Sequence, residues 1–363
     1  MQLIIKGDIH YALYHFALYG AAAILQESLP GAVIRINWLG PDEAALLIEA
    51  AEPLGSDDVA RILHDHARGH TDSWVQATHQ HRSGKKATTV GTFSPRLPLA
   101  ADADSWRALQ TARHALIDEA LEQRSWLDLA FMHALGEPAY WYLNRQGKHV
   151  PDVGSSGWEM KTRNRGEEFM RNRLSLLADS VTAREPQQVL AGLLGDYRED
   201  EVGRNSVDSR TPTGLRPPYP TDNALAWIAL WGISCFPVVH RATDPTAYEK
   251  AQGAPSITTA QLRGAPGLNR LRRAYTVLPH IARPMRLSTL KSVLVSGSLA
   301  RLAAAHIRAE HDPSAPTEPR APRDAAWLRT KGVGGLMLSV LTASDNPNAP
   351  ELAVTRGQLA GLP

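Results

Sequence analysis

The chain has 363 residues, of which 43% are hydrophobic and 21% charged, so it is long and apolar enough to fold around a sizeable core. Its single cysteine, Cys235, excludes an internal disulfide framework and any zinc or iron–sulfur site built from several cysteines. No segment has the length and low charge of a membrane-spanning helix, and the N-terminus lacks the pattern of a secretory signal. We therefore expect a soluble cytoplasmic protein of about two domains, without a membrane partner.

Hydrophobic periodicity predicts strands and helices in alternation over the first part of the chain. A strand pattern over residues 2–6 precedes a helix pattern over residues 10–27, which the Pro30–Gly31 pair stops. A hairpin follows, with strands predicted over residues 32–39 and 43–52. Further helices are predicted over residues 56–67 and 105–121.

A soft domain boundary is expected near residue 150, where a cluster of aromatic residues is followed by the loop sequence PDVGSSG. Beyond it, helices are predicted over residues 167–182, after Pro186, and from Asp222 or Asn223 to Gly232, where the chain enters a strand ending near Val239. Trp227 and Trp231 stand four positions apart on the last of these helices. We expect both in the core, because that spacing places them on one buried face.

Residues 195–221, between two of the predicted helices, are polar and contain several prolines and glycines. A stretch of that length without secondary structure is uncommon in a compact domain and is usually functional or disordered. The alternative interpretation is a domain linker stiffened by its prolines.

Toward the C-terminus, strands are predicted over residues 275–281, 336–341 and 353–356, and a helix over residues 297–309. The pattern at residues 288–295 is ambiguous, and the proline-rich residues 311–323 indicate a flexible connection. The expected fold class is α+β, with mixed helices and short antiparallel sheets, long polar loops and two subdomains. The expected organisation is an N-terminal α+β domain (residues 1–150), a basic nucleic-acid-contacting domain (151–310) and a C-terminal connection with a strand segment (311–363).

Charges are unevenly distributed along the chain, although the net charge is only +2. Residues 250–309 contain ten bases and no Asp or Glu, where an even spread of the 37 acids would place about six. Residues 73–101 also lack acids, and residues 161–173 carry five bases and two acids. Each run alone is as well explained by a solvated face balanced by acids elsewhere. Three runs together favour segregated charge and a polyanionic partner.

The basic segments are also rich in side chains that bind phosphate. Arginine offers a planar fork that matches phosphate oxygens, and Asn, Ser and Thr donate further hydrogen bonds without charge. This composition recurs in KTRNRG, in GRNSVDSRTPTGLRPPYP and in LNRLRR. Such contacts position a nucleic acid without reading its sequence. Trp158 and Tyr219, next to basic loops, are candidates for stacking against bases.

Enzyme motifs are sparse, and one cluster suggests chemistry: His64, Asp65, His66 and His70. His66 and His70 are four residues apart and would share a helix face, as two metal ligands require. No HExxH motif accompanies them. The alternative to nucleic-acid binding is therefore a metal-dependent phosphohydrolase or nuclease built on this cluster. Cys235 lies in an apolar stretch and is expected in the core rather than in catalysis.

Three parts of the sequence resemble one protein family. They are HYALYHFALYGAAAIL with the strand AVIRINWL, the segment SRTPTGLRPPYPTDNALAWIALWGISCFPVVH, and RPMRLSTLKSVLVSG. Together they are similar to the large subunits of type I CRISPR surveillance complexes (Cascade), nearest to subtype G, formerly U. In those subunits a helix of the kind AL.WLAL.G...FP follows a polar basic loop, and residues 224–237 carry that pattern here. The chain is short for such a subunit.

The resemblance implies a non-catalytic scaffold that holds guide RNA, inspects the protospacer-adjacent motif in target double-stranded DNA and stabilises the displaced strand. The implied partners are guide RNA, target DNA, other Cascade subunits and a recruited helicase-nuclease that performs the cleavage. No cofactor and no catalytic residue are expected. Whether a small-subunit function is fused at the C-terminus is left open, and a third hypothesis is a structural subunit whose basic surfaces meet acidic proteins.

We expect backbone contact from the bases of residues 161–173 and 270–291, and motif reading from the loop that contains Asn205, Ser206, Arg210 and Thr211. Two lysines at residues 85–86 suit a mobile loop on a strand. The candidate nucleic-acid-binding residues are Lys85, Lys86, Lys161, Arg163, Asn164, Arg165, Arg171, Arg173, Arg204, Asn205, Ser206, Arg210, Thr211, Arg216, Asn269, Arg270, Arg272, Arg273, Arg283, Arg286 and Lys291.

Overall fold

The computed structural model describes residues 1–95, 97, 100–135, 141–143, 149–151, 169–207, 209, 213–236, 261–262, 274–314, 316–343 and 352–363. The helices are α1 (Ala12–Ser28), α2 (Ser56–Arg68), α3 (Ala103–Glu122), α4 (Trp126–Leu135), α6 (Ser175–Thr182), α7 (Pro186–Leu194), α8 (Asn223–Trp231), α10 (Leu287–Leu294), α11 (Gly297–His311) and α12 (Ala321–Thr330). They are accompanied by the π-helical turn η1 (Met170–Leu174) and the 3₁₀ turn η2 (Gly232–Cys235). None of the helices in these ranges is long and apolar enough to span a membrane.

The strands are β1 (Gln2–Lys6), β2 (Val33–Gly40), β3 (Glu43–Glu49), β4 (Thr78–Ser83), β5 (Lys86–Gly91), β6 (Trp141–Leu143), β7 (His149–Pro151), β8 (Gln261–Leu262), β9 (Ala274–Ile281), β10 (Val333–Ala343), β11 (Leu352–Val354) and β12 (Gln358–Gly361). One sheet has the order β1–β3–β2, and a second has the order β11–β10–β9–β8 with β12 also paired to β10. β4 pairs with β5 and β6 with β7. Every pairing between described strands is antiparallel, which confirms the predicted α+β class.

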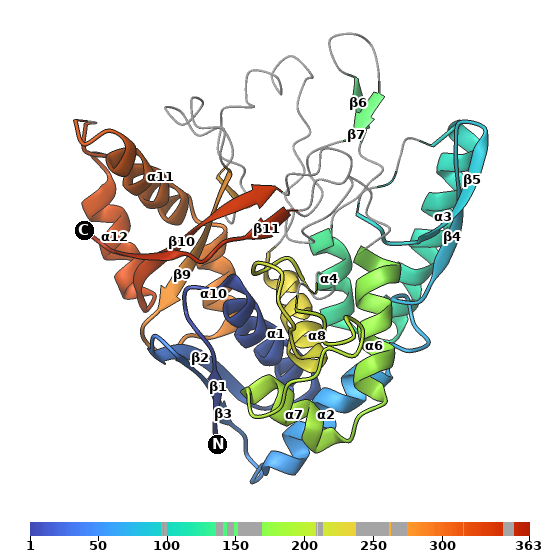
Figure 1. Cartoon of the computed structure of the whole chain (residues 1–363), viewed down its shortest axis with the longest axis horizontal. Coiled ribbons are helices and arrows are strands. Elements are labelled where there is room, and N and C mark those ends of the chain that lie inside the picture. Colours follow the sequence, from blue (N-terminus) through green and yellow to red (C-terminus); the bar gives the residue numbers. More distant parts are fainter. Residues whose placement is uncertain are drawn as a thin grey trace.

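Helix α1 lies at the centre of the core because its sequence is apolar on all sides. Every residue from His15 to Leu25 is buried, which is the expected state of a helix without a polar face. In Figure 1, α1 (dark blue) and α8 (yellow) lie side by side near the middle of the molecule. All nine residues of α8 are buried, including Trp227 and Trp231, which confirms their predicted core position.

Two glycines let α1 and the α8–η2 segment approach backbone to backbone. A Cβ atom on Gly20 of α1 would lie 1.8 Å from the carbonyl oxygen of Ile228. A Cβ atom on Gly232 would lie 2.3 Å from the carbonyl oxygen of Phe16. The contact therefore requires the absence of a side chain at both positions.

The N-terminal sheet is joined by a backbone bridge to the segment between β9 and α10. The N–H of Ile36 in β2 donates to the carbonyl of Met285, and the N–H of Met285 donates to the carbonyl of Ile36, both at 2.9 Å. A single cluster of buried apolar side chains extends from Leu3 to Ala360. The described parts of the three predicted domains therefore share one core.

Most predicted elements lie close to their expected positions, and the differences have local causes. Residues 232–235, where the predicted strand should begin, form the 3₁₀ turn η2, and such turns are frequent at the C-terminal ends of helices. The predicted end of this strand near Val239 lies outside the described residues. The ambiguous segment at residues 288–295 is helix α10. Helix α12 starts inside the proline-rich connection, with Pro322 near its N-terminus where no N–H is needed. Helix α4 and the β4–β5 hairpin were not predicted; β4 (THQHRS) lacks apolar alternation.

We predict that Gly20→Ala lowers the free energy of unfolding by about 3 kcal/mol, because the new methyl group meets backbone that cannot move aside. Urea denaturation followed by circular dichroism measures this change. The matched control is Gly31→Ala, since a Cβ atom there has nothing within 4 Å. Equal stability of the two variants would contradict the close approach of α1 and α8.

Candidate nucleic-acid interface

The candidate contact residues divide between described and undescribed parts of the chain. Those outside the described residues are Lys161, Arg163, Asn164, Arg165, Arg210, Thr211, Asn269, Arg270, Arg272 and Arg273. Trp158, the other stacking candidate, also lies outside them. The remaining candidates lie on the β4–β5 hairpin, on η1, in the loop between α7 and α8, and around α10.

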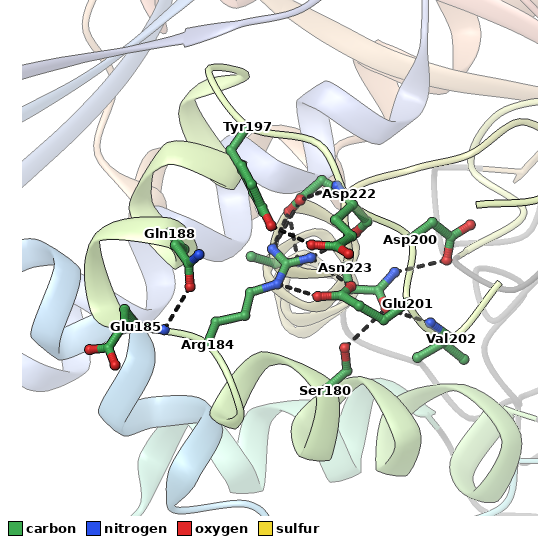
Figure 2. A network of polar contacts seen from close by, with 12 residues as sticks. Ser180, Arg184, Glu185, Gln188, Tyr197, Asp200, Glu201, Val202, Asp222 and Asn223 are labelled. Carbon is green, nitrogen blue, oxygen red and sulfur yellow. Dashed lines mark hydrogen bonds and ion pairs between the residues drawn. The ribbon is translucent and has the colours of Figure 1, made fainter. Parts of the chain in front are cut away.

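The loop between α7 and α8, here called the polar loop (residues 195–222), is held by one buried guanidinium. Arg184 follows α6, and only 5% of its side chain is exposed. Its Nη1 donates to both carboxylate oxygens of Asp222, at 3.0 and 2.9 Å, while Nε and Nη2 each donate to Glu201 at 2.6 Å. Nη2 also donates to the carbonyl of Glu199 at 2.7 Å, so the guanidinium makes five hydrogen bonds (Figure 2). Arg184 therefore joins Glu199 and Glu201, near the start of the polar loop, to Asp222 at its end.

The Asp222 carboxylate connects this ion pair to α8. It accepts hydrogen bonds from the N–H groups of Ala224 and Leu225 and so caps α8; of the two residues that the sequence offered for the start of this helix, Asp222 and Asn223, Asp222 is the cap. Its Oδ2 also accepts from the N–H of Glu199 at 3.0 Å. Burial raises the pKa of the Asp222 carboxyl, and the charge of Arg184 and the N–H donors oppose that shift. One side chain thus caps a helix, closes the polar loop and balances a buried cation.

Asn223, the next residue, fixes the middle of the polar loop. Its Oδ1 accepts from the N–H of Val202 at 3.0 Å and from the hydroxyl of Ser180 at 3.2 Å. Its Nδ2 donates to the carboxylate of Asp200 at 2.9 Å. Asp200 in turn exchanges two hydrogen bonds of 2.8 Å with Asn205, one through the Asn205 side chain and one through its backbone N–H. Figure 2 shows Ser180, Asp200 and Val202 around Asn223 at the start of α8.

The tip of the polar loop carries three of the predicted contact residues. Arg204 and Asn205 have φ angles of 54° and 53°, in the left-handed region that residues other than glycine rarely adopt. The contacts between Asp200 and Asn205 hold this conformation. The side-chain oxygen of Asn205, predicted to read bases, is therefore engaged within the loop, although Arg204, Asn205 and Ser206 are all exposed residues.

The other end of the polar loop places two arginines against tyrosine rings. The guanidinium of Arg216 lies 4.3 Å from the ring centroid of Tyr219 and 5.6 Å from that of Tyr11. Arg198 lies 5.4 Å from the Tyr219 ring and donates to its hydroxyl at 2.9 Å. Tyr219 is 40% exposed. We call these four residues the Arg–Tyr platform; neither arginine has a carboxylate partner among the described residues.

The hairpin lysines and the η1 arginines occupy different environments. Lys85 and Lys86 are exposed at the tip of the β4–β5 hairpin. Gly84 has a φ of 61°, so the tip is a tight two-residue turn rather than a longer loop. Arg171 donates from Nη1 to a carbonyl of β5 at 2.8 Å. Arg173 is only 8% exposed, so it lies inside the fold and not on an exposed basic surface as predicted.

The acid-free run of residues 250–309 is partly neutralised in three dimensions. Arg301 donates from two nitrogens to Asp324 at 2.7 Å, and Arg308 lies 3.4 Å from Glu318. Both carboxylates come from the chain beyond the run. The bases of this run that have no carboxylate partner within the described residues are Arg283, Arg286 and Lys291.

Two histidines of the cluster, His66 and His70, pack against the aromatic core, whereas Asp65 is exposed. His66 is half-buried with both ring nitrogens buried, and its ring centroid lies 4.3 Å from that of Trp231 and 4.6 Å from that of His70. Nε2 of His70 lies 2.9 Å from the Asp128 carboxylate. Across the described ranges, no group of three His, Cys, Asp or Glu side chains is placed to hold a metal ion. This arrangement favours a structural role for the cluster over the metal-dependent alternative.

The sequence did not indicate several residues that build this interface. Arg198 belongs to the same polar stretch as the stacking candidate Tyr219, and this shared stretch is the sequence signal that could have indicated it. Arg184 carries no comparable signal, because its partner Asp222 is 38 residues away in the chain. Tyr11 likewise joins the Arg–Tyr platform only through the fold.

We predict that Asp222→Asn lowers the free energy of unfolding by about 3 kcal/mol, because the buried Arg184 guanidinium loses its counter-charge. Limited proteolysis should then cut within residues 195–222. The control is Asp196→Asn, whose partner Lys6 is exposed and whose loss changes stability by less than about 1 kcal/mol. If both variants unfold at the same denaturant concentration, the ion pair does not hold the polar loop.

Stability should also depend on pH through His66. Burial, with a smaller contribution from His70, holds the pKa of His66 well below 6.5, so the unfolded chain takes up a proton there before the folded chain does. Stability therefore falls as pH drops below about 6.5, by up to about 1.4 kcal/mol per pH unit for this group. His66→Leu should reduce that slope between pH 6.5 and 4.5 in urea titrations. The control Leu39→Ala, which changes an exposed side chain and removes no titratable group, keeps the original slope; an unchanged slope in His66→Leu would refute the assignment.

Comparison with known proteins identifies no relative: no protein-family model matches the sequence, and no curated protein is significantly similar to it.

Proposed function

We propose that this chain is a non-catalytic, nucleic-acid-binding subunit of a CRISPR Cascade effector complex, in which it contacts guide RNA and target DNA. The observation that carries the nucleic-acid part is the Arg–Tyr platform, where Arg198 and Arg216 lie against the exposed ring of Tyr219 without a carboxylate partner among the described residues. The Cascade part rests on the resemblance of the polar loop and of the helix that follows it. That helix is α8, which Asp222 caps.

The chemistry of the platform suits a sugar–phosphate backbone next to an unpaired base. Guanidinium groups donate paired hydrogen bonds to phosphate oxygens and also stack on flat rings. An exposed tyrosine ring offers a base a surface whose stacking is insensitive to sequence. The buried ion pair of Arg184 and Asp222 holds the supporting loop in place, so little conformational freedom is lost on binding.

Within this proposal, the tip of the polar loop approaches the edges of base pairs in the protospacer-adjacent motif. Arg204 and Ser206 are exposed there, and Tyr219 is joined to the tip through hydrogen bonds of Ser209 with Tyr219 and Ser206. Arg210 and Thr211 belong to the same loop in the sequence. Duplex recognition and backbone contact would thus come from adjacent surfaces, while other Cascade subunits and a recruited helicase-nuclease supply guide assembly and cleavage.

We predict that the double variant Arg198→Ala/Arg216→Ala binds single-stranded RNA at least about tenfold more weakly, because two phosphate contacts are lost. In a salt titration followed by fluorescence anisotropy, the slope of log affinity against log salt should fall by about 1.4, since each contact to a single strand contributes about 0.7. Arg107→Ala is the control, since its arginine is 70% exposed and paired with Asp104. Unchanged affinity and slope in the double variant would remove the nucleic-acid assignment.

Membership of a Cascade complex has its own test. The protein purified from its native cells should carry RNA of uniform length whose sequence derives from a CRISPR array. If the bound RNA is heterogeneous while the protein still binds RNA in solution, the proposed binding surface stands and membership of a Cascade complex is contradicted.

A further inference from the structure

A second surface, separate from the polar loop, combines a cavity, an exposed tryptophan and two cations. The cavity has a volume of about 420 Å³ and lies between the end of α1, the start of α4 and the start of α10. Its lining includes Trp126, Glu27, Arg286, Ser288 and Lys291. The volume is within the range of small-molecule sites, about 300–1,000 Å³.

Trp126 is exposed because of how α4 begins. Arg124 has a φ of 56°, which turns the chain sharply between α3 and α4, and Trp126 becomes the first residue of α4. The following residues Leu127 and Phe131 are buried, while Trp126 remains 60% exposed. The other tryptophans whose exposure is described are buried or half-buried. Its exposed ring at the edge of the cavity offers a flat face against which an aromatic ligand can stack.

Two cations complete the other side of the cavity. Arg286 precedes α10 and Lys291 lies within it, and neither has a carboxylate partner in the described ranges. No side chain caps the N-terminus of α10, so its first N–H groups add to the positive potential at the position of Ser288. Glu27 is the one carboxylate in the lining, and one of its oxygens accepts from the N–H of Leu127 at 3.2 Å.

We propose that this cavity binds one unpaired nucleotide of a bound nucleic-acid strand. The base stacks on Trp126, its phosphate meets Arg286 and Lys291, and the free oxygen of Glu27 accepts from an exocyclic amino group of the base. This arrangement rests on the proposed function and places the strand at a second point, distinct from the Arg–Tyr platform. An acidic protein segment matches the cations equally well, but an aromatic face combined with a carboxylate and two cations suits a base and its phosphate better.

The test uses the full-length protein and a single-stranded RNA of random sequence that contains 4-thiouridine. Ultraviolet crosslinking followed by mass spectrometry should recover RNA attached to the peptide that contains Trp126. In anisotropy titrations, Trp126→Ala should weaken binding of the same RNA about tenfold, and Trp126→Phe should restore most of the affinity. Arg286→Ala/Lys291→Ala should weaken binding and reduce the salt slope by about 1.4, since each cationic contact to a single strand contributes about 0.7. The control Leu39→Ala removes an apolar side chain that is 53% exposed and should change nothing.

The outcomes separate the two proposals. Crosslinks confined to the polar loop, with wild-type affinity in Trp126→Ala, overturn the nucleotide site and leave the proposed function intact. Binding of poly-glutamate that depends on Trp126, without any effect of Trp126→Ala on RNA, assigns the cavity to an acidic protein and also overturns the proposal. If the wild-type protein binds no RNA, the proposed function and the nucleotide site fall together.

Discussion

Arg184 and Asp222 form an ion pair whose two side chains are 5% and 2% exposed, and the polar loop takes its position from them. Removing two charges from water is unfavourable, and mutual attraction compensates only where geometry is good and the remaining donors are satisfied. That condition is met here, because the guanidinium makes five hydrogen bonds and the carboxylate also caps α8. The described residues of this long polar connection are therefore held in place by side-chain contacts rather than by helix or strand hydrogen bonds.

The packing of α1 against α8 brings Tyr11 and Tyr219, the two tyrosines of the Arg–Tyr platform, to the same arginine, Arg216. Tyr11 stands at the N-cap of α1, while Tyr219 lies just before α8. The close backbone approach at Gly20 and Gly232 fixes how these helices lie against each other. As a result Arg216 contacts the rings of both tyrosines, which are far apart in the chain. The position of the surface site thus depends on the tightest contact of the core.

Charge in the folded chain is more balanced than the basic runs imply. Arg301 is paired with Asp324, a buried acid from the following helix, and Arg173 is itself buried. Cations without a carboxylate partner among the described residues include Lys85 and Lys86 at the hairpin tip and Arg204 in the polar loop, as well as those of the Arg–Tyr platform and of the surface around α10. The platform and the surface around α10 also present an exposed aromatic ring, Tyr219 in one and Trp126 in the other. This coincidence, more than the number of bases, supports the proposed binding of nucleic acid.

The sequence alone determined the α+β class, the central apolar helices and the start of α8 at Asp222 or Asn223, because these follow from local periodicity and from side-chain to backbone hydrogen bonds within a few residues. It also marked Arg204, Arg216 and Tyr219 as surface candidates. Only the tertiary structure decided which arginines are buried, paired or free to meet a ligand, since their partners lie tens of residues away. The pairing of Arg184 with Asp222 and the burial of His66 against Trp231 depend on how helices pack, and no local pattern encodes that geometry.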